Sequence, residues 1–131
     1  MLKKGYVKTI QDAFDRFIGE KKCCFDPGPS FGVQETIDQV HQAQGKVFIA
    51  HPNSIGHNKT LYEILDMNVD GIECYYSILH CKREARFLQL AKNRNLLISG
   101  GSDFHGEIKP HIALGCSYVD KSTVEKIFGP L

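Results

Sequence analysis

Val47-Phe48-Ile49-Ala50-His51-Pro52 is the stretch of this sequence that decides the fold. Its four apolar residues form a short continuous run, which is typical of a strand buried on both faces of a parallel sheet. The run predicts a strand over residues 46–50, and similar runs predict strands over 69–74 and 96–99. A further short strand is compatible with residues 113–119.

Helical patterns surround these strands. Apolar residues at helical spacing predict a first helix, opened by a Thr9–Asp12 capping box, with one buried face formed by Ile10, Ala13, Phe14, Phe17 and Ile18. Further helices are predicted over 33–44, from a Thr60–Glu63 capping box onward, over 81–93, and from a Ser122–Glu125 capping box to Gly129. Strands that alternate with helices indicate an α/β fold with a parallel sheet. Three or four strands are too few for a closed barrel, which needs about eight.

Length and charge narrow the class of protein. The 131 residues, 42% apolar and 24% charged, fit one globular domain. A net charge of +1 gives no electrostatic reason to expect a nucleic-acid polymer or an anionic membrane as partner. No apolar run approaches the ~20 residues that span a bilayer, and Met1-Leu2-Lys3-Lys4-Gly5-Tyr6 contains neither the apolar region nor the cleavage site of a secretory leader. We therefore expect a cytoplasmic protein.

The cysteines point the same way. There are five, an odd number with no CxxC pair, so a disulfide framework or a structural zinc site is not indicated. We expect reduced thiols, several of them in the core, as is usual for free cysteine.

Polar side chains follow each predicted strand at its carboxyl end. They are His51 after the first strand, Glu73, Tyr75 and Tyr76 at the second, and Asp103 and His105 after the third. Parallel α/β folds place their sites at this edge. The Asp103-Phe104-His105 tripeptide can aim a carboxylate and an imidazole at one ion, a donor pair that suits zinc, manganese or iron. Each motif taken alone is equally compatible with ordinary loop residues.

Taken together, these motifs resemble those of a known family. The stretches concerned are Ala50-His51-Pro52, Asp70-Gly71-Ile72-Glu73, Gly100-Gly101-Ser102-Asp103-Phe104-His105-Gly106, Lys4-Gly5-Tyr6-Val7, and Lys109-Pro110 with Leu114-Gly115. They resemble the PHP (polymerase and histidinol phosphatase) superfamily, in particular its small metal-dependent phosphoesterases that act on nucleotides and nucleoside bisphosphates. The resemblance covers nearly the whole chain.

The resemblance implies a fold, a cofactor and a reaction. The fold would be a distorted (β/α)7 TIM-like barrel with up to three divalent metal ions, zinc, manganese or iron. His51, Asp103 and His105 match three family ligands. The family's N-terminal H-x-H motif does not occur in the 131 residues. We therefore expect residues 1–131 to be the C-terminal part of a PHP domain, supplying part of the metal site and showing little activity alone. The implied reaction is hydrolysis of a phosphomonoester, nucleotide-type or another small phosphorylated substrate.

The chain departs from the family pattern at one position. Many relatives carry Arg three residues after the His of the His-Pro motif, and here that residue is Ser54. His57, Lys59 or Lys109 could supply the lost charge for substrate binding, or could be solvated surface residues. Glu73 could orient a ligand or substrate, or simply end a strand. Tyr75 and Tyr76 could line the substrate pocket or fill the barrel rim.

Two other functions remain open at this level. One is a non-catalytic interaction or regulatory domain, which the Ser54 departure favours. The other is a cysteine hydrolase that uses Cys74 or Cys116. Whichever holds, a partial barrel leaves the 46–50 strand at an open sheet edge, and such edges recruit other chains. Self-association is therefore expected, unless the early helices cover the gap.

Overall fold

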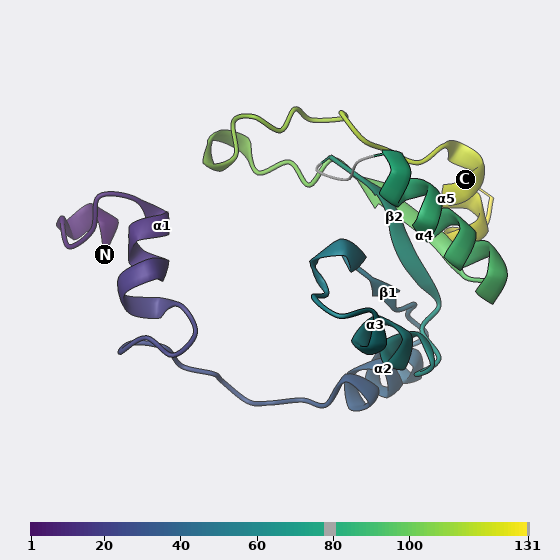
Figure 1. The fold of residues 1–131 in the computed structure, drawn as a ribbon, viewed down its shortest axis with the longest axis horizontal. Helices are drawn as coiled ribbons and strands as arrows, with labels where there is room; N and C mark the ends of the chain where they lie inside the picture. The colour runs from purple at the N-terminus through teal and green to yellow at the C-terminus, as the bar shows by residue number, and fades with distance from the viewer. Residues whose placement is uncertain (78–80, 131) are drawn as a thin grey trace. The chain divides into compact units, whose positions relative to one another are not determined.

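The structure is a computed structural model that describes residues 1–77 and 81–130. The chain divides into two compact units, Met1–Gly32 and Val33–Leu131. The second unit contains the sheet and the candidate site, and Figure 1 shows its helices and strands.

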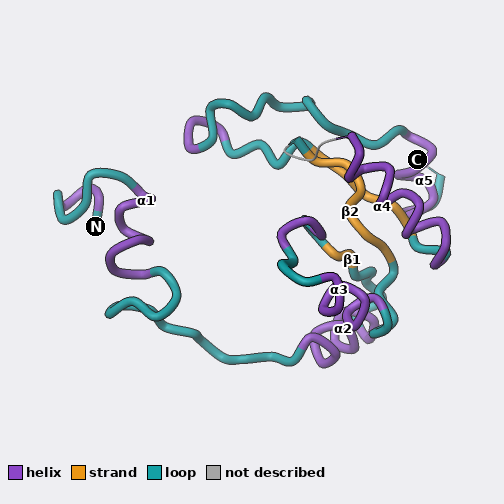
Figure 2. Tube along the Cα trace, viewed as in Figure 1, coloured by secondary structure: helices purple, strands orange, loops and turns teal. Residues whose placement is uncertain are grey.

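A parallel three-stranded sheet forms the centre of the second unit, in agreement with the α/β prediction. The strands are β1 (Phe48–Ile49), β2 (Gly71–Tyr76) and β3 (Leu97–Gly101). Their order is β1-β2-β3, and both pairs are parallel (Figure 2). Strand β1 is shorter than predicted, and β2 lies two residues further along the chain than the predicted 69–74. The seven-stranded barrel stays an expectation from the family resemblance.

Two glycines set the register of this sheet. The Phe48 ring covers Gly71, where an added Cβ would lie 2.2 Å from a ring carbon of Phe48. At Gly100 an added Cβ would lie 2.6 Å from the backbone oxygen of Tyr75. The register of β2 on β3 shifts between Glu73 and Tyr75, beside this close approach. Both positions therefore need a residue without a side chain.

Among the described residues, four α-helices accompany the sheet: α2 (Val33–Gln42), α3 (Asn58–Leu65), α4 (Cys81–Arg94) and α5 (Lys121–Phe128). Two predicted capping boxes are wrong. Helix α3 starts before Thr60, with His57 as its N-cap, because the Leu61 N–H already bonds to the His57 carbonyl. Helix α5 is capped by Asp120, whose carboxylate accepts the Thr123 N–H at 2.9 Å. A carboxylate is favoured there by the positive end of the helix.

The core lies on one face of the sheet. Its fully buried side chains are Ile37 of α2, Leu61 of α3, Ile72 and Cys74 of β2, and Phe87 of α4. Along β2 these residues alternate with Glu73 and Tyr75, which are only half-buried. Helices α2, α3 and α4 therefore cover the face of β2 that carries Ile72 and Cys74.

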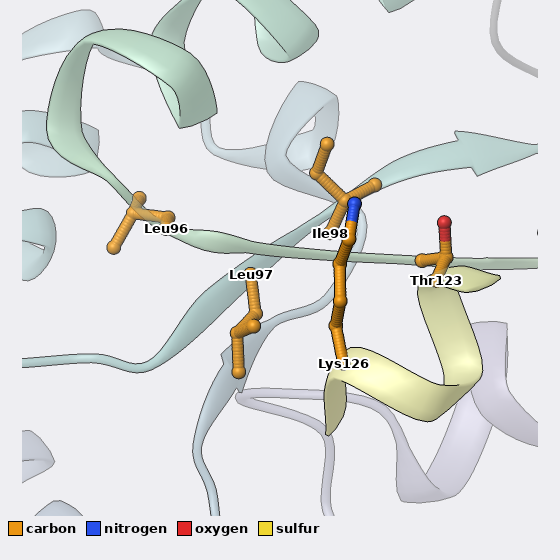
Figure 3. Close-up of a pocket in the computed structure, with 5 residues that line it drawn as sticks. All are labelled: Leu96, Leu97, Ile98, Thr123 and Lys126. Carbon is orange, nitrogen blue, oxygen red and sulfur yellow. The ribbon is translucent and has the colours of Figure 1, made fainter. Parts of the chain in front are cut away.

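Helix α5 packs against the first residues of β3 and leaves a small cavity of about 100 Å³. Figure 3 shows the residues that line it, Leu96, Leu97 and Ile98 on one side and Thr123 and Lys126 on the other. The lining carries no carboxylate, imidazole or thiol, and its polar side chains are those of Thr123 and Lys126.

A long connection joins β3 to α5 (Figure 1). It includes one short 3₁₀ turn, Gly106–Ile108, and residues 113–119 form no strand, contrary to the expectation. Leu114 and Tyr118 are largely exposed, so this segment lacks the buried neighbours that a strand needs.

The first unit contains a 3₁₀ turn (Leu2–Lys4), α1 (Ile10–Ala13) and a π-helical segment (Phe14–Ile18). Thr9 caps α1 as predicted, since its Oγ1 accepts the Asp12 N–H at 3.0 Å. The predicted buried face is wrong: Ala13 is buried, but Ile10, Phe14 and Ile18 are exposed. A 32-residue unit has too little apolar surface to cover such a face.

Two further expectations concern the cysteines and the membrane. Of the cysteine side chains described, Cys74 is buried, whereas Cys23, Cys24 and Cys116 are exposed, so the expectation of several core cysteines is wrong. None of the helices among the described residues has the length and apolar character needed to cross a membrane.

Candidate active site

The site lies at the carboxyl ends of the three parallel strands, where the sequence predicted it. A cavity of about 250 Å³ opens at this edge. It is lined by His51, Asn53, Ser54, Tyr76, Asp103 and Lys109. Residues that follow β1 and β3 and residues of β2 therefore share one surface.

His51 is held in an unusual backbone conformation. Its φ of 47° and ψ of 52° are left-handed, which costs a non-glycine residue about 1–3 kcal/mol. Two contacts oppose this cost. The His51 N–H donates to Glu73 Oε2 at 2.8 Å, and Ser54 Oγ donates to the His51 carbonyl at 2.7 Å. The conformation turns the imidazole toward the cavity, with Nε2 3.6 Å from Glu73 Oε2.

Asp103 lies at the centre of the site. It too has a positive φ, 52°. Its Oδ1 is 3.8 Å from His51 Nε2 and 3.6 Å from His105 Nδ1, and Lys109 Nζ donates to its Oδ2 at 2.9 Å. The hydrogen bond from Lys109 holds the pKa of Asp103 below its usual value, and the charges of His105 and His51 act in the same direction. Asp103 is therefore a carboxylate at neutral pH.

His105 is oriented by a backbone contact. Its Nδ1 lies 2.6 Å from the Asp103 carbonyl oxygen, which can only accept, so Nδ1 carries the proton. The neutral tautomer then has its lone pair on Nε2. Such a contact to a carbonyl is common for imidazoles that bind a metal through the other nitrogen.

The donor set suits a divalent metal ion in its chemistry, since it combines carboxylate oxygens with imidazole nitrogens. Two ligands of one tetrahedral ion lie about 3.4 Å apart, given bonds of about 2.1 Å. The 3.8 Å separation between His51 Nε2 and Asp103 Oδ1 is slightly longer. His105 would bind an ion through Nε2, because its Nδ1 faces the Asp103 carbonyl. Within residues 1–77 and 81–130, no three His, Cys, Asp or Glu residues are arranged to hold an ion as they stand.

The sequence left the role of Glu73 open, and the structure shows that this residue contacts His51. Its carboxylate bonds to the His51 backbone and lies beside the His51 ring, so it is positioned to orient this imidazole. Tyr76 lines the cavity, with its ring 5.1 Å from the His51 ring. Burial and then the charge of Glu73 raise the pKa of Tyr76, so its phenol keeps its proton.

Other sequence candidates lie apart from the cavity. Tyr75 is half-buried on the neighbouring part of β2 and does not line the cavity. His57 is the exposed N-cap of α3, and Lys59 lies 3.7 Å from Glu63 on the same helix. Of the three cations considered as substitutes for the missing arginine, the structure brings Lys109 to the cavity.

Two residues at or beside the cavity, Asn53 and Arg83, were not predicted from the sequence. Asn53 lines the cavity, and Arg83 Nη1 donates to its Oδ1 at 2.8 Å. A signal for Arg83 was present: it lies in the first turn of α4, the helix that follows β2. In parallel α/β units such a helix starts near the carboxyl edge of the sheet.

Cys74 does not fit a cysteine hydrolase. Its side chain is fully buried, and burial together with the charge of Glu73 raises its pKa to about 12. The reactive thiolate is therefore absent near neutral pH.

The fold is α/β, with polar side chains gathered at the carboxyl edge of a parallel sheet, and known proteins share it. No family model matches the chain. The crystal structure of a candidate metal-dependent phosphoesterase from Bifidobacterium adolescentis superposes with a TM-score of 0.75 and 30% identity, over 97% of this chain and 46% of that one. An amidohydrolase from Chromobacterium violaceum, 22% identical, shares the fold with a TM-score of 0.64, over 93% of this chain and 44% of that one.

Curated relatives extend the comparison. The chain is 26% identical to the 5'-3' exoribonuclease Rnm of Salmonella typhimurium, over 85% of this chain and 39% of the relative. It is 27% identical to the phosphoribosyl 1,2-cyclic phosphate 1,2-diphosphodiesterase of Eggerthella lenta, over 60% of this chain and 31% of the relative. The chain thus spans less than half the length of each.

The resemblance to the metal-dependent phosphoesterases of the PHP superfamily is thereby confirmed. These relatives hydrolyse, or are assigned to hydrolyse, phosphoesters. Since Rnm is an exoribonuclease, the charge-based expectation that nucleic-acid polymers are not substrates has to be tested directly.

Proposed function

We propose that this chain forms part of a metal-dependent phosphoesterase that hydrolyses small phosphorylated substrates of the nucleotide type. The observation that carries the proposal is the convergence of three side chains from two strand ends, His51 after β1 and Asp103 with His105 after β3. His51 Nε2 and His105 Nδ1 lie 3.8 and 3.6 Å from Asp103 Oδ1. Metal-dependent hydrolysis of a phosphoester is also supported by the α/β fold, by the donor atoms of these side chains and by the phosphoesterase relatives.

His51, Asp103 and His105 would hold the metal ion, zinc, manganese or iron. A bound ion supplies a water of lowered pKa and neutralises phosphate oxygens. Glu73 keeps the His51 ring in place through the backbone, and the Asp103 carbonyl fixes the tautomer of His105. Lys109 lines the cavity and donates to the Asp103 carboxylate. Its ammonium could release this carboxylate and bind an incoming phosphate oxygen instead.

In this proposal residues 1–131 correspond to the C-terminal part of a PHP domain and supply part of the metal site. The absence of an H-x-H motif from the 131 residues supports this view, and so does the chain's coverage of less than half the length of its relatives. A non-catalytic role is less favoured, because the likeness to phosphoesterases covers 97% of the chain.

Metal titration of the chain and of single variants tests the proposal. Mn²⁺ or Zn²⁺ should bind weakly, and His105→Ala or Asp103→Ala should abolish binding, since each removes a ligand. His111→Ala, a nearby exposed histidine outside the cavity lining, is the matched control and should bind like the wild type. If the two ligand variants bind metal as well as the control does, the proposal is wrong.

Turnover tests the proposal that the chain supplies only part of the site. With Mn²⁺ present, hydrolysis of p-nitrophenyl phosphate or a nucleoside monophosphate by the isolated chain should stay near background, because part of the site is missing. Robust hydrolysis that His105→Ala abolishes would show that the chain is sufficient and would contradict the partial-site proposal. A short oligoribonucleotide assayed beside the mononucleotide distinguishes RNA cleavage from action on small phosphates.

A further inference from the structure

Arg83 lies in helix α4, not at a strand end, and it places a positive charge at the rim of the cavity. It lies in the first turn of α4 (Cys81–Arg94) and is exposed. Its Nη1 donates to Asn53 Oδ1 at 2.8 Å, and Asn53 is one of the residues that line the cavity. The guanidinium is thus anchored at the site although the two residues are 30 apart in sequence.

Asn53, the hydrogen-bond partner of the Arg83 guanidinium, is neutral and therefore does not offset its positive charge. Lys109, the other cation at the cavity, is paired with the Asp103 carboxylate at 2.9 Å. Arg83, by contrast, is held by a neutral carboxamide. Arginine has five N–H donors in a planar fork, and among the described residues the one contact to Asn53 leaves others for an anion. Ser54, beside Asn53 in the lining, carries no charge of its own.

We propose that Arg83 binds the phosphate group of the substrate at the cavity rim and that Asn53 positions its guanidinium. The inference rests on the proposed phosphoesterase function and names a residue that determines recognition of the phosphate. A guanidinium matches two phosphate oxygens at once, which an ammonium cannot do. An asparagine fixes the arginine without neutralising it, whereas a carboxylate would compete with the substrate.

Phosphate binding by charge-matched variants tests the inference. Inorganic phosphate is titrated calorimetrically into the full 131-residue chain with Mn²⁺ present, for the wild type, Arg83→Met and Arg86→Met. Arg86 is the control because it is also exposed on α4, and its Nη2 also donates to an asparagine, Asn58, at 2.7 Å. Arg86 lines a different cavity, so both variants lose one charge but only Arg83→Met changes the site.

The expected result is a rise of about tenfold in the phosphate Kd for Arg83→Met and less than about twofold for Arg86→Met. Arg83→Lys should fall between the wild type and Arg83→Met, because it keeps the charge and loses the fork. Equal effects of the two methionine variants, or no measurable phosphate binding by the wild type, would overturn the inference. Circular dichroism confirms that each variant is folded.

The failure of this inference can be told apart from failure of the proposed function. If metal binding needs His105 while Arg83→Met and Arg86→Met bind phosphate alike, the function stands and the inference falls. If phosphate binding depends on Arg83 while metal binding is indifferent to His105, the anion site stands and the phosphoesterase proposal falls.

Discussion

His51 and Asp103 share a left-handed backbone, with φ values of 47° and 52°. Neither residue is glycine, so each conformation must be stabilised by its surroundings. Glu73 accepts the His51 N–H, and Lys109 binds the Asp103 carboxylate. Conformations of this kind gather at functional sites, where they aim a side chain that a relaxed backbone would turn elsewhere.

Replacing Glu73 with Ala should therefore weaken metal binding without removing a proposed ligand. The variant leaves the His51 N–H without its acceptor and frees the imidazole to turn. We expect the Mn²⁺ affinity to fall by roughly 10–100-fold, as is typical when an orienting partner of a ligand is lost. Calorimetric titration measures the change, with Glu63→Ala on the exposed face of α3 as the matched control. Equal affinities in the two variants would show that Glu73 does not orient His51.

At the scale of elements, Asp70 joins α2 to the start of β1. Its Oδ2 accepts the Val47 N–H at 2.7 Å and lies 2.8 Å from His41 Nε2. Burial by itself would raise the pKa of Asp70, but the Val47 N–H, His41 and the charge of Lys46 together hold that pKa below its usual value. The ionised carboxylate is thus the form that stabilises this junction.

The lowered pKa of Asp70 determines how the free energy of unfolding should change with pH. The pKa of Asp70 is lower in the folded state than its unfolded value of about 3.9. Its contribution is therefore present above pH ~4 and is lost as the pH falls through the folded pKa. Asp70→Asn should cost about 1 kcal/mol in urea unfolding at about pH 7, and the difference from the wild type should shrink near pH ~3. The exposed Asp38→Asn serves as control; a difference for Asp70→Asn that does not change with pH would contradict the assignment.

The pairing of β2 with β3 depends on Gly100. A Cβ there would lie 2.6 Å from the Tyr75 backbone oxygen, which cannot rotate away as a side chain would. Gly100→Ala should therefore destabilise the chain by about 1–3 kcal/mol. At the neighbouring Gly101 an added Cβ would meet no heavy atom within 4 Å, so Gly101→Ala is the control. Thermal unfolding compares the two variants, and similar midpoints would rule out the steric explanation.

At the scale of the whole molecule, β1 is at one edge of the described sheet. A cavity of about 400 Å³ lies beside it, lined by Gln44, Gly45, Lys46, Phe48, Ile127 and Phe128. Phe128 is 78% exposed, and unpaired strands next to apolar side chains are common sites of association.

We accordingly expect the 131-residue chain to self-associate, with two copies covering each other's open edge. Size-exclusion chromatography with light scattering measures the mass as the protein concentration is raised. Phe128→Lys should shift the population toward monomer, because it places a charge on the exposed apolar surface. A single species near 14.7 kDa at all concentrations of the wild type would contradict the prediction.

Local patterns in the sequence determined the main elements of the fold and the place of the site. Continuous apolar runs identified all three strands of the described sheet, and the polar residues after them identified its carboxyl edge. These predictions succeeded because strand burial and helix periodicity are properties of neighbouring residues. Boundaries and caps were less reliable, as α3 and α5 show, since a helix start depends on which acceptor the folded chain supplies.

Tertiary structure alone decided how the site is assembled. The Glu73 contact with His51 joins residues 22 apart in sequence, and the Arg83 contact with Asn53 joins residues 30 apart. The exposure of the first helix likewise depended on how little apolar surface its own unit provides. Sequence periodicity reports which side chains are apolar and at what spacing, but contacts between distant segments arise only when the sheet brings their ends together.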